Sequence, residues 1–364
     1  MNIQLFDNFE EIRAQREQWD HVATGCPFQS WAWLGTWFEH LGTESTPAVL
    51  VAIENGQWVG VAPFWIDDSV TMNQKLRFWG DGKTCTDYVG LIASPEIMED
   101  FTFAVVDWLN NECASGGKLE NIDLIELEGM AAENDLNGLL REVFEASGFA
   151  THVAEIEGCW VTDLPSSWEE LNTSFSKSMR RKTKKAVSRV TSDACKIQSS
   201  NDGNFESLWS NFVDLHQKRR QMLGDEGCFS DPRFENFLRS ATLELIKEGR
   251  AELVVIQFDD EPLASMLLFN NGDTNFMYQS GADQTRMKLE PGYQIATVAI
   301  QKSIESGFQH FDFMRGDEPY KARWSSKRIP MMTIRFVPRN LRSRIKHNVW
   351  LTGQTIKNYL RTRQ

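Results

Sequence analysis

The sequence predicts an α/β (α+β) protein made of two tandem domains, each a mixed, mostly antiparallel sheet flanked by helices. Three observations lead to this fold class. The same order of segments occurs twice: a hairpin, a third strand, a helix and a short closing strand. The hairpins join apolar, β-branched runs through polar turns. The length of 364 residues suits two domains of ordinary size.

The two copies correspond segment by segment. The first copy is predicted at residues 48–53, 59–64, 76–79, 99–110 and 122–124. The second copy is predicted at residues 251–256, 263–268, 275–278, 293–305 and 311–313. Further helices are expected at residues 28–40, 167–189, 205–223 and 232–249 from apolar spacing and from capping residues. These assignments predict domains at residues 1–155 and 160–338, followed by a basic tail at 339–364.

Composition excludes several classes of protein. The net charge of -13 argues against general binding of nucleic acid. The six cysteines are scattered and the histidines form no His-x-x-x-His pair, so we expect reduced thiols and no metal site. No apolar run reaches the roughly 18–20 residues that span a bilayer, and the first residues lack the layout of a signal peptide. We therefore expect a cytoplasmic protein.

The most informative stretch is residues 307–324. A short strand, Phe311 to Met314, leads into a turn dense in ionisable groups and in aromatic residues with polar tips. The members of this turn are Arg315, Asp317, Glu318, Tyr320, Lys321, Arg323 and Trp324. Strand ends that carry such clusters are common places for ligand sites. The alternative interpretation is a salt-bridged turn at the surface.

This stretch resembles the BioF2-like, or CelD-like, acyltransferases of the GCN5-related N-acetyltransferase (GNAT) superfamily, which are related to the FemAB peptidyltransferases. The segments that carry the resemblance are residues 178–182, 215–216, 219–220, 229–232, 291–292, 307, 311–313 and 316–321. The resemblance covers residues 165–340 well and the first 150 weakly. It implies two GNAT-like domains, the second catalytic. It also implies an acyl-CoA donor and, as acceptor, an amino group on a sugar or other small precursor of the cell envelope or of an exopolysaccharide.

Acyl transfer to an amine needs a neutral amine, a polarised carbonyl and a proton for the leaving group. Asp312 or Asp317 is the candidate base, Tyr320 the candidate acid, and Lys321 the candidate for holding an oxyanion or a phosphate. Strand alternation turns Asp312 away from its apolar neighbours, so we expect it to face a cleft, with a pKa raised by burial. A structural hydrogen bond is the alternative role for Asp312.

A second candidate is the helix start at Pro291 and Gly292. Pro at the first helical position prepares a helix N-terminus, whose free N–H groups and partial positive charge favour phosphate. In GNAT enzymes the corresponding turn holds the pyrophosphate of coenzyme A. The resemblance therefore implies donor-binding roles for Glu290, Gly292, Tyr293, Gln294 and Ile295. Gln294 departs from the family, which usually has a small residue at this position. An ordinary helix start is the alternative.

Other residues are assigned to the substrate. His216 and Arg220 share a helix face, and with Arg219 they offer donors to a carboxylate or phosphate. Asp87 and Tyr88 follow the third strand of the first domain, where the resemblance places an acceptor between domains. A purely structural first domain is the alternative. The remaining substrate-binding candidates are Gln279, Arg315 and Trp324.

Two segments are basic although the chain is acidic. Residues 177–189 and 338–364 each carry seven Lys and Arg and no acid. The first segment leaves open a FemAB-like enzyme that uses aminoacyl-tRNA, or a non-catalytic module that binds anions. The second reads as an amphipathic helix with Leu341, Ile345, Val349, Ile356 and Leu360 at near-helical spacing. It can lie on an anionic membrane surface, with the protein peripheral to its inner face, or dock on its own acidic body, which we favour.

Overall fold

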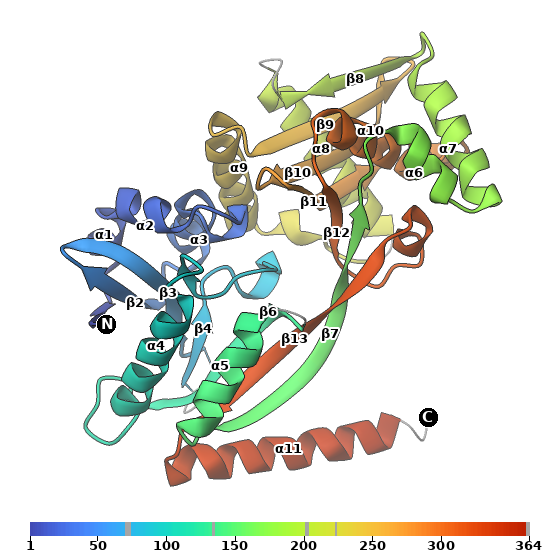
Figure 1. The fold of residues 1–364 in the computed structure, drawn as a ribbon. Coiled ribbons are helices and arrows are strands. Elements are labelled where there is room, and N and C mark those ends of the chain that lie inside the picture. The colour runs from blue at the N-terminus through green and yellow to red at the C-terminus, as the bar shows by residue number, and fades with distance from the viewer. Residues whose placement is uncertain (70–73, 133–134, 201–203, 223, 362–364) are drawn as a thin grey trace.

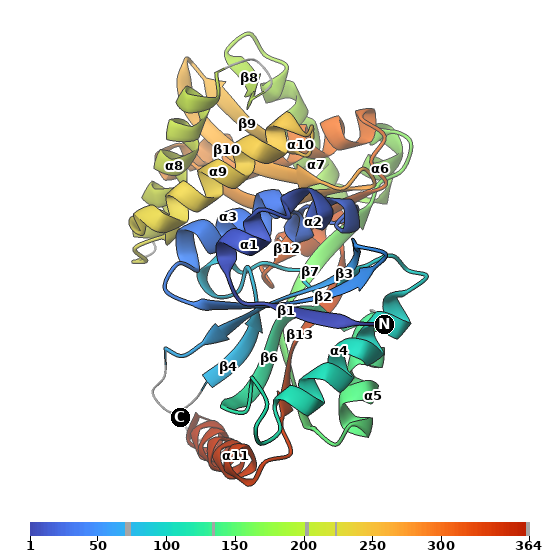
Figure 2. The same ribbon diagram turned by 90° about the vertical axis from the view of Figure 1, so that its left-hand side faces the viewer.

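The computed structural model describes residues 1–364 except 70–73, 133–134, 201–203, 223 and 362–364, and of residues 354–361 it describes the backbone alone. A single sheet runs through the molecule in the order β1-β2-β3-β4-β6-β13-β7-β12-β11-β10-β9-β8, with β5 paired to β3 (Figure 1). Helices lie on both faces of this sheet (Figure 2). The expected mixed, mostly antiparallel sheet flanked by helices is confirmed.

The predicted repeat is present in the strands. The first half contains β1 (Ile3–Phe6), β2 (Thr46–Glu54), β3 (Gln57–Asp67), β4 (Gln74–Phe78), β5 (Ile92–Ala93) and β6 (Ile122–Ala131). The second half contains β8 (Cys195–Ser199), β9 (Ala251–Phe258), β10 (Glu261–Asn270), β11 (Thr274–Ala282) and β12 (His310–Arg315). In each half a hairpin is followed by a parallel pair, β4 with β6 and β11 with β12. A helix connects the strands of each pair.

Two long strands join the halves. β7 (Ala150–Asp163) follows the first half in sequence but pairs with β12 of the second. β13 (Lys327–Val337) follows the second half but pairs with β6 of the first. The two strands also pair with each other along most of their length. The halves therefore exchange their last strands, and β7 spans the boundary that the sequence predicted between residues 155 and 160. The division into domains stays a prediction.

The helices match most of the predicted segments. They are α1 (Phe9–Arg13), α2 (Arg16–Val22), α3 (Trp31–Leu41), α4 (Met98–Glu112), α5 (Asp135–Ala146), α6 (Trp168–Ser174), α7 (Lys177–Val190), α8 (Phe205–Met222), α9 (Pro232–Lys247), α10 (Pro291–Glu305) and α11 (Leu341–Arg361). α7 and α10 pack together, and α8 packs on β10 and β11. Residues 167–189 form two helices and not one. Phe175 has an extended backbone that ends α6, and Ser176 then caps the start of α7, as Ser167 caps the start of α6. None of the described helices combines the length and apolar character needed to cross a bilayer.

One of the two hydrophobic clusters among the described residues contains side chains of both halves. Trp33 of α3 is fully buried, and its ring lies 5.0 Å from Phe237 of α9 and 5.0 Å from Tyr278 of β11. Phe28 packs edge-to-face on Phe269 and Phe276 of the second half. Large buried rings contribute roughly 1.5–3 kcal/mol each. The two halves are therefore packed together through buried aromatic side chains.

Candidate active site

The sheet opens between β11 and β12. These parallel strands pair only where Thr274–Phe276 meets His310–Asp312. Beyond that point β11 continues to Ala282, while β12 turns away to pair with β7. An irregularity where β10 pairs with β11, between Leu267 and Leu268, adds to the bend. A bulge of this kind bends a strand and re-aims its side chains, so the opening is built into the backbone.

A pocket of about 340 Å³ occupies this opening. Its lining comes from α7, α8, β10, β11, the start of α10 and the turn after β12. The polar and charged members are Lys182, Arg219, Ser280, Gln284, Glu290, Tyr293 and Tyr320. The others are Met266, Met277, Gly281, Ala282, Met287, Pro291, Gly292, Ile295, Ala296 and Trp324. The lining therefore has a charged part, where Lys182 meets Glu290, and apolar side chains such as Met266 and Met277. We call the charged part the charged end.

The start of α10 forms the charged end. Glu290 has a left-handed backbone with φ of 54°, and Pro291 follows as the first helical residue. Gly292 lines the pocket, and a Cβ built there meets no atom within 4 Å. A helix N-terminus with a residue lacking a side chain lets an anion come close to the backbone. Gln294 does not obstruct this approach, since its side chain is fully buried and Nε2 donates to the Leu289 carbonyl at 2.7 Å.

Basic side chains of α7 gather at the same end. Lys182, Lys185 and Arg189 lie 3.7, 3.4 and 3.3 Å from the Glu290 carboxylate. Arg189 also donates to the carbonyls of Leu289 and Lys288. Three cations around one carboxylate leave a net positive charge beside the helix start. This arrangement suits an anionic ligand.

Tyr293 forms one wall. The Lys182 ammonium lies 4.2 Å from the centre of the Tyr293 ring, and Arg323 donates to the Tyr293 hydroxyl at 3.0 Å. The ring lies 6.1 Å from the ring of Trp324. A cation over an aromatic face is favourable by about 0.5–2 kcal/mol. The wall is therefore held before any ligand binds.

Tyr320 and Arg219 both line the pocket. Burial raises the pKa of the Tyr320 phenol, so the hydroxyl keeps its proton at neutral pH. Arg219 has no ion pair with any residue that the structure describes, although its charge reaches Tyr320. A protonated phenol can give a proton, and a guanidinium without a carboxylate partner can take an anion.

Asp312 lies outside the pocket. It is 1% exposed, and its carboxylate accepts hydrogen bonds from the Tyr88 hydroxyl at 2.6 Å and from the Met314 N–H at 2.7 Å. The expectation that Asp312 faces a cleft is wrong, because the loop around Tyr88 covers that side of β12. The expected pKa shift is present, since burial raises the pKa of Asp312 to about 7.

Asp87 and Arg315 lie beside this pair. Arg315 of β12 approaches Asp87 at 2.7 Å and Glu128 of β6 at 2.6 Å. Asp87 is 1% exposed, and neither Asp87 nor Tyr88 lines the pocket. These side chains link the two halves through buried ion pairs and hydrogen bonds.

Lys321 supports the turn instead of lining the pocket. Its ammonium is 2% exposed and donates to the carbonyls of Met314 and Arg315 at 3.0 and 2.9 Å, with Glu318 also 3.0 Å away. Met314 has a left-handed backbone, φ 57°, so the chain leaves β12 sharply here. Lys321 thereby holds the turn that carries Tyr320.

Four other candidates point elsewhere. Asp317 is at the surface, where hydrogen bonds from Arg328 hold its pKa below the usual value. Gln279 contacts Cys228, and Arg220 pairs with Asp225 at 3.6 Å. His216 is buried against Phe229, and burial lowers its pKa to about 4. Of the four predicted catalytic residues, Tyr320 alone lines the pocket.

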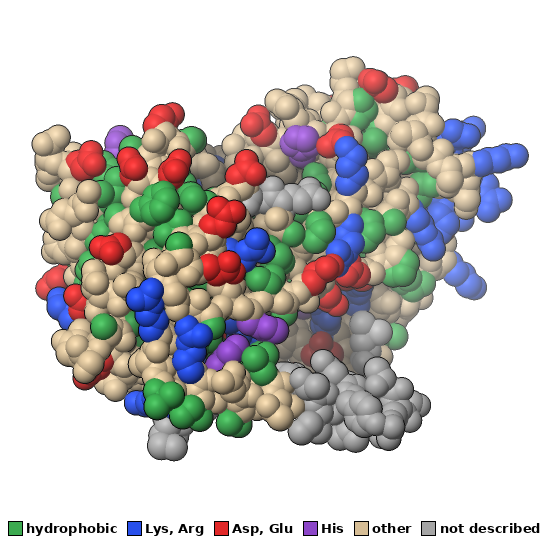
Figure 3. Space-filling model, turned by 60° about the horizontal axis from the view of Figure 1, so that its bottom comes forward, with side chains coloured by type: hydrophobic (Ala, Val, Ile, Leu, Met, Phe, Trp, Pro, Cys, Tyr) green, Lys and Arg blue, Asp and Glu red, His purple; other side chains and the backbone are tan. Residues whose placement is uncertain are grey.

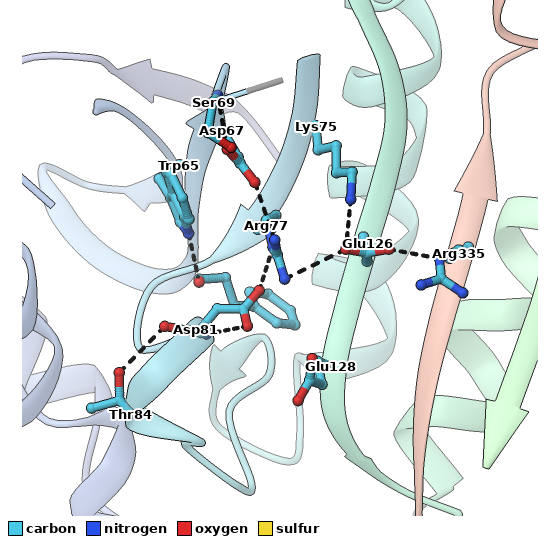
Figure 4. Close-up of polar contacts among 12 residues, drawn as sticks. Trp65, Asp67, Ser69, Lys75, Arg77, Asp81, Thr84, Glu126, Glu128 and Arg335 are labelled. Carbon is cyan, nitrogen blue, oxygen red and sulfur yellow. Dashed lines mark hydrogen bonds and ion pairs between the residues drawn. The ribbon is translucent and has the colours of Figure 1, made fainter. Parts of the chain in front are cut away.

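The equivalent place in the first half is nearly closed. The cavity after β4 measures about 10 Å³ and is bordered by Asp81, Glu128 and Arg315. A single water needs about as much space. Above it, Arg77 donates to Asp67 and Asp81 and lies 3.4 Å from Glu126 (Figure 4). An internal network of charges therefore fills the place that is open in the second half.

Sequence reasoning missed part of the pocket. In the sequence alone, Lys182 is only one member of a basic run. Lys182 and Arg189 lie about two helical turns apart, and this spacing could have indicated that both face α10, where they pair with Glu290. Met266 and Met277 on the apolar side gave no signal, because methionine is a common core residue. Gly281 lines the pocket where β11 passes against α8 so closely that a Cβ would lie 2.7 Å from the Leu215 side chain.

Comparisons with known proteins agree with this geometry. Residues 173–322 match the model of the acetyltransferase (GNAT) domain family. This range holds every pocket residue except Trp324. No curated protein matches the chain. In the residues that the structure describes, no group of three or more His, Cys, Asp or Glu is placed to hold a metal ion.

Three solved structures are similar over most of the chain. FemX has a TM-score of 0.60 at 12% identity, covering 91% of this chain and 97% of its own. A Bacteroides thetaiotaomicron protein of unknown function has a TM-score of 0.58 at 11% identity, with 92% and 100% covered.

The third is the C-terminal domain (DUF2156) of an Agrobacterium fabrum protein named as a lysylphosphatidylglycerol synthetase. Its TM-score is 0.55 at 10% identity, with 93% and 96% covered. At such identities the likeness shows the fold. The family match identifies residues 173–322 as an acetyltransferase domain of the GNAT type, and the chain is an acyltransferase.

Proposed function

We propose that the protein transfers an acyl group from acyl-CoA to an amino group of a sugar or other precursor of the cell envelope or of an exopolysaccharide. The observation that carries the donor assignment is the pocket at the β11–β12 opening. Its lining combines the start of α10 and Lys182 with Arg219 and with apolar side chains such as Met266 and Met277. An acyl-CoA likewise has phosphates at one end and a thioester with an apolar chain at the other.

The pocket residues divide the chemistry between them. The helix start at Gly292, together with Lys182, binds the phosphates. Met266 and Met277 surround the acyl end. The neutral amine nitrogen forms a C–N bond with the thioester carbonyl carbon and loses one proton to solvent, the C–S bond breaks, and the departing thiolate takes a proton. Tyr320 supplies that proton, because burial keeps its phenol protonated.

The class of acceptor rests on resemblance. The turn after β12 resembles the BioF2-like and CelD-like acyltransferases, which suggests polysaccharide-related substrates. On this resemblance we propose an amino group of such a precursor as the acceptor.

A second candidate function is transfer from aminoacyl-tRNA. The observation that favours it is the outer face of α7, where Lys177, Arg180, Arg181 and Lys184 are exposed beside the pocket. In Figure 3, a group of Lys and Arg side chains projects from one edge of the molecule. Such a row can follow a phosphate backbone. The third candidate, a non-catalytic module, would bind the anion in the same pocket without turnover.

Substitution of Gly292 by Val tests the donor site. We expect Gly292→Val to raise the KM for acyl-CoA at least tenfold, about 1.4 kcal/mol of lost binding, and to change the KM for the acceptor little. A side chain at Gly292 has open space in the fold but occupies the place where the phosphate would lie. Steady-state kinetics with each substrate varied in turn provides the measurement.

Gly138→Val is the matched control, since Gly138 lies on α5 with nothing within 4 Å of a built Cβ. It should leave both KM values unchanged. If Gly292→Val left the KM for acyl-CoA unaltered, the proposal that the donor phosphates bind at the start of α10 would be wrong.

A further inference from the structure

α11 docks on the protein through its polar face. Asp123 of β6 accepts a hydrogen bond from Ser343 and pairs with Lys346 at 2.5 Å and with Arg342 at 3.3 Å. Ser343 is 1% exposed. Asp123 is 4% exposed, so its charge is well covered. The helix is therefore held by charges, as we expected for docking on the acidic body.

Aromatic contacts extend the same docked face. Arg335 of β13 lies 4.4 Å from the centre of the Trp350 ring, and the His152 ring lies 5.4 Å from it. Arg335 in turn donates to Glu126 at 2.6 Å (Figure 4). Ser343, His347 and Trp350 recur at helical spacing, so they define one side of α11.

A second row of side chains on α11 is apolar and largely exposed to solvent. Leu341, Ile345 and Val349 are 75%, 54% and 68% exposed. They lie four residues apart and so form one stripe along the helix. An amphipathic helix normally buries its apolar side against the protein. Here Leu341, Ile345 and Val349 stay largely exposed, although Ile345 and Val349 also border a groove of about 400 Å³ between α11 and the sheet. Exposed apolar side chains in a row are expected of a helix that has a second surface to contact.

The charge around the stripe identifies the kind of surface. Residues 338–364 carry seven Lys and Arg and no acid, in a chain whose net charge is -13. Two copies meeting stripe to stripe would bring these positive segments together, which is unfavourable. An anionic lipid surface offers an apolar layer for the stripe and negative charge for the tail, which stays positive although Arg342 and Lys346 pair with Asp123. Figure 3 views the molecule from the side on which α11 lies.

We propose that α11 attaches the protein to an anionic membrane surface. The stripe of Leu341, Ile345 and Val349 enters the boundary between headgroups and acyl chains, and the docked polar face keeps the body of the enzyme against the bilayer. Ile356 and Leu360 continue the spacing in sequence, but their side chains lie outside the described part of the chain.

Co-sedimentation of the full chain with vesicles tests the proposal. We expect binding to vesicles of phosphatidylglycerol and phosphatidylcholine, weakening as salt is added, and at least tenfold weaker binding to phosphatidylcholine alone. The triple variant Leu341→Gln, Ile345→Gln, Val349→Gln should lose at least tenfold of the affinity for the anionic vesicles. Glutamine keeps the helix propensity, and the exposed positions carry no core packing.

Phe103→Gln is the control, because Phe103 on α4 is also an exposed apolar residue, at 48%, and should bind vesicles as the wild type does. Equal binding of wild type and triple variant, or no binding to anionic vesicles, would overturn the proposal. The proposal would also be overturned if analytical ultracentrifugation showed the wild type as a dimer and the triple variant as a monomer, since the stripe would then contact a second copy of the chain.

Discussion

Replacement of Tyr320 by Phe is expected to lower kcat about a hundredfold, which corresponds to about 2.7 kcal/mol of barrier. The phenol is half-buried in the pocket, and burial raises its pKa, so it is protonated when the thiolate departs. Phenylalanine keeps the ring but removes the only proton that this side chain can give. Single-turnover rates with saturating acyl-CoA provide the measurement. Affinity for the donor should change little, because the phosphates lie at the other end.

Tyr293→Phe is the matched control for this experiment. Tyr293 lines the same pocket, but its hydroxyl accepts a hydrogen bond from Arg323 and stands at the charged end. Its loss should affect the donor KM and leave kcat within a few-fold of wild type. A full kcat in Tyr320→Phe, or an equal loss of kcat in both variants, would exclude Tyr320 as the acid.

The second large effect is on stability as a function of pH. Burial raises the pKa of Asp312 from 3.8 to about 7. In the folded protein the carboxyl therefore keeps its proton up to about pH 7, while in the unfolded chain it loses it near pH 4. The stabilising contribution is fully present below pH 4 and is lost as the pH rises through 7. The free energy of unfolding should fall by roughly 4 kcal/mol over this window.

Asp312→Asn isolates this contribution from other carboxyls. The amide has the same shape, and the Tyr88 hydroxyl can turn to accept from it, while the Met314 N–H still donates to the remaining oxygen. We would measure the unfolding free energy of wild type and variant by denaturant titration from pH 4 to pH 8. The difference between the two should change by roughly 4 kcal/mol over this range. A difference that is constant with pH would show that Asp312 is ionised throughout.

Local sequence signals identified much of this site. Pro291 and Gly292 predicted a helix start, and the structure places it at the pocket. Tyr320 and Trp324 were singled out by their density in a short turn, and both line the pocket. The repeated order of hairpin, strand, helix and strand predicted both halves. These features depend on residues that are close in sequence, where spacing and capping preferences act directly.

The remaining features depend on contacts between distant parts of the chain. Tyr88 covers Asp312 although the two are 224 residues apart in sequence. Strand alternation therefore predicted that Asp312 points away from Phe311 and Phe313, but it could not predict that Tyr88 fills the space on that side. β13 pairs with β6 of the other half, and nothing in its own residues distinguishes that partner from β12. Lys321 looks like a ligand-binding cation in sequence, but the left-handed turn at Met314 brings two carbonyls to its ammonium.

The most direct test is the stability of the protein in the presence of each donor. Coenzyme A, acetyl-CoA, longer acyl-CoAs and an aminoacyl-tRNA would be compared by thermal unfolding, on wild type and on Gly292→Val. We predict that CoA and acyl-CoA at 100 times Kd stabilise the wild type by about 2.7 kcal/mol, and that at the same concentrations Gly292→Val is stabilised by no more than about 1.4 kcal/mol. Stabilisation by aminoacyl-tRNA alone, or by no donor, would contradict an acyl-CoA site at the start of α10.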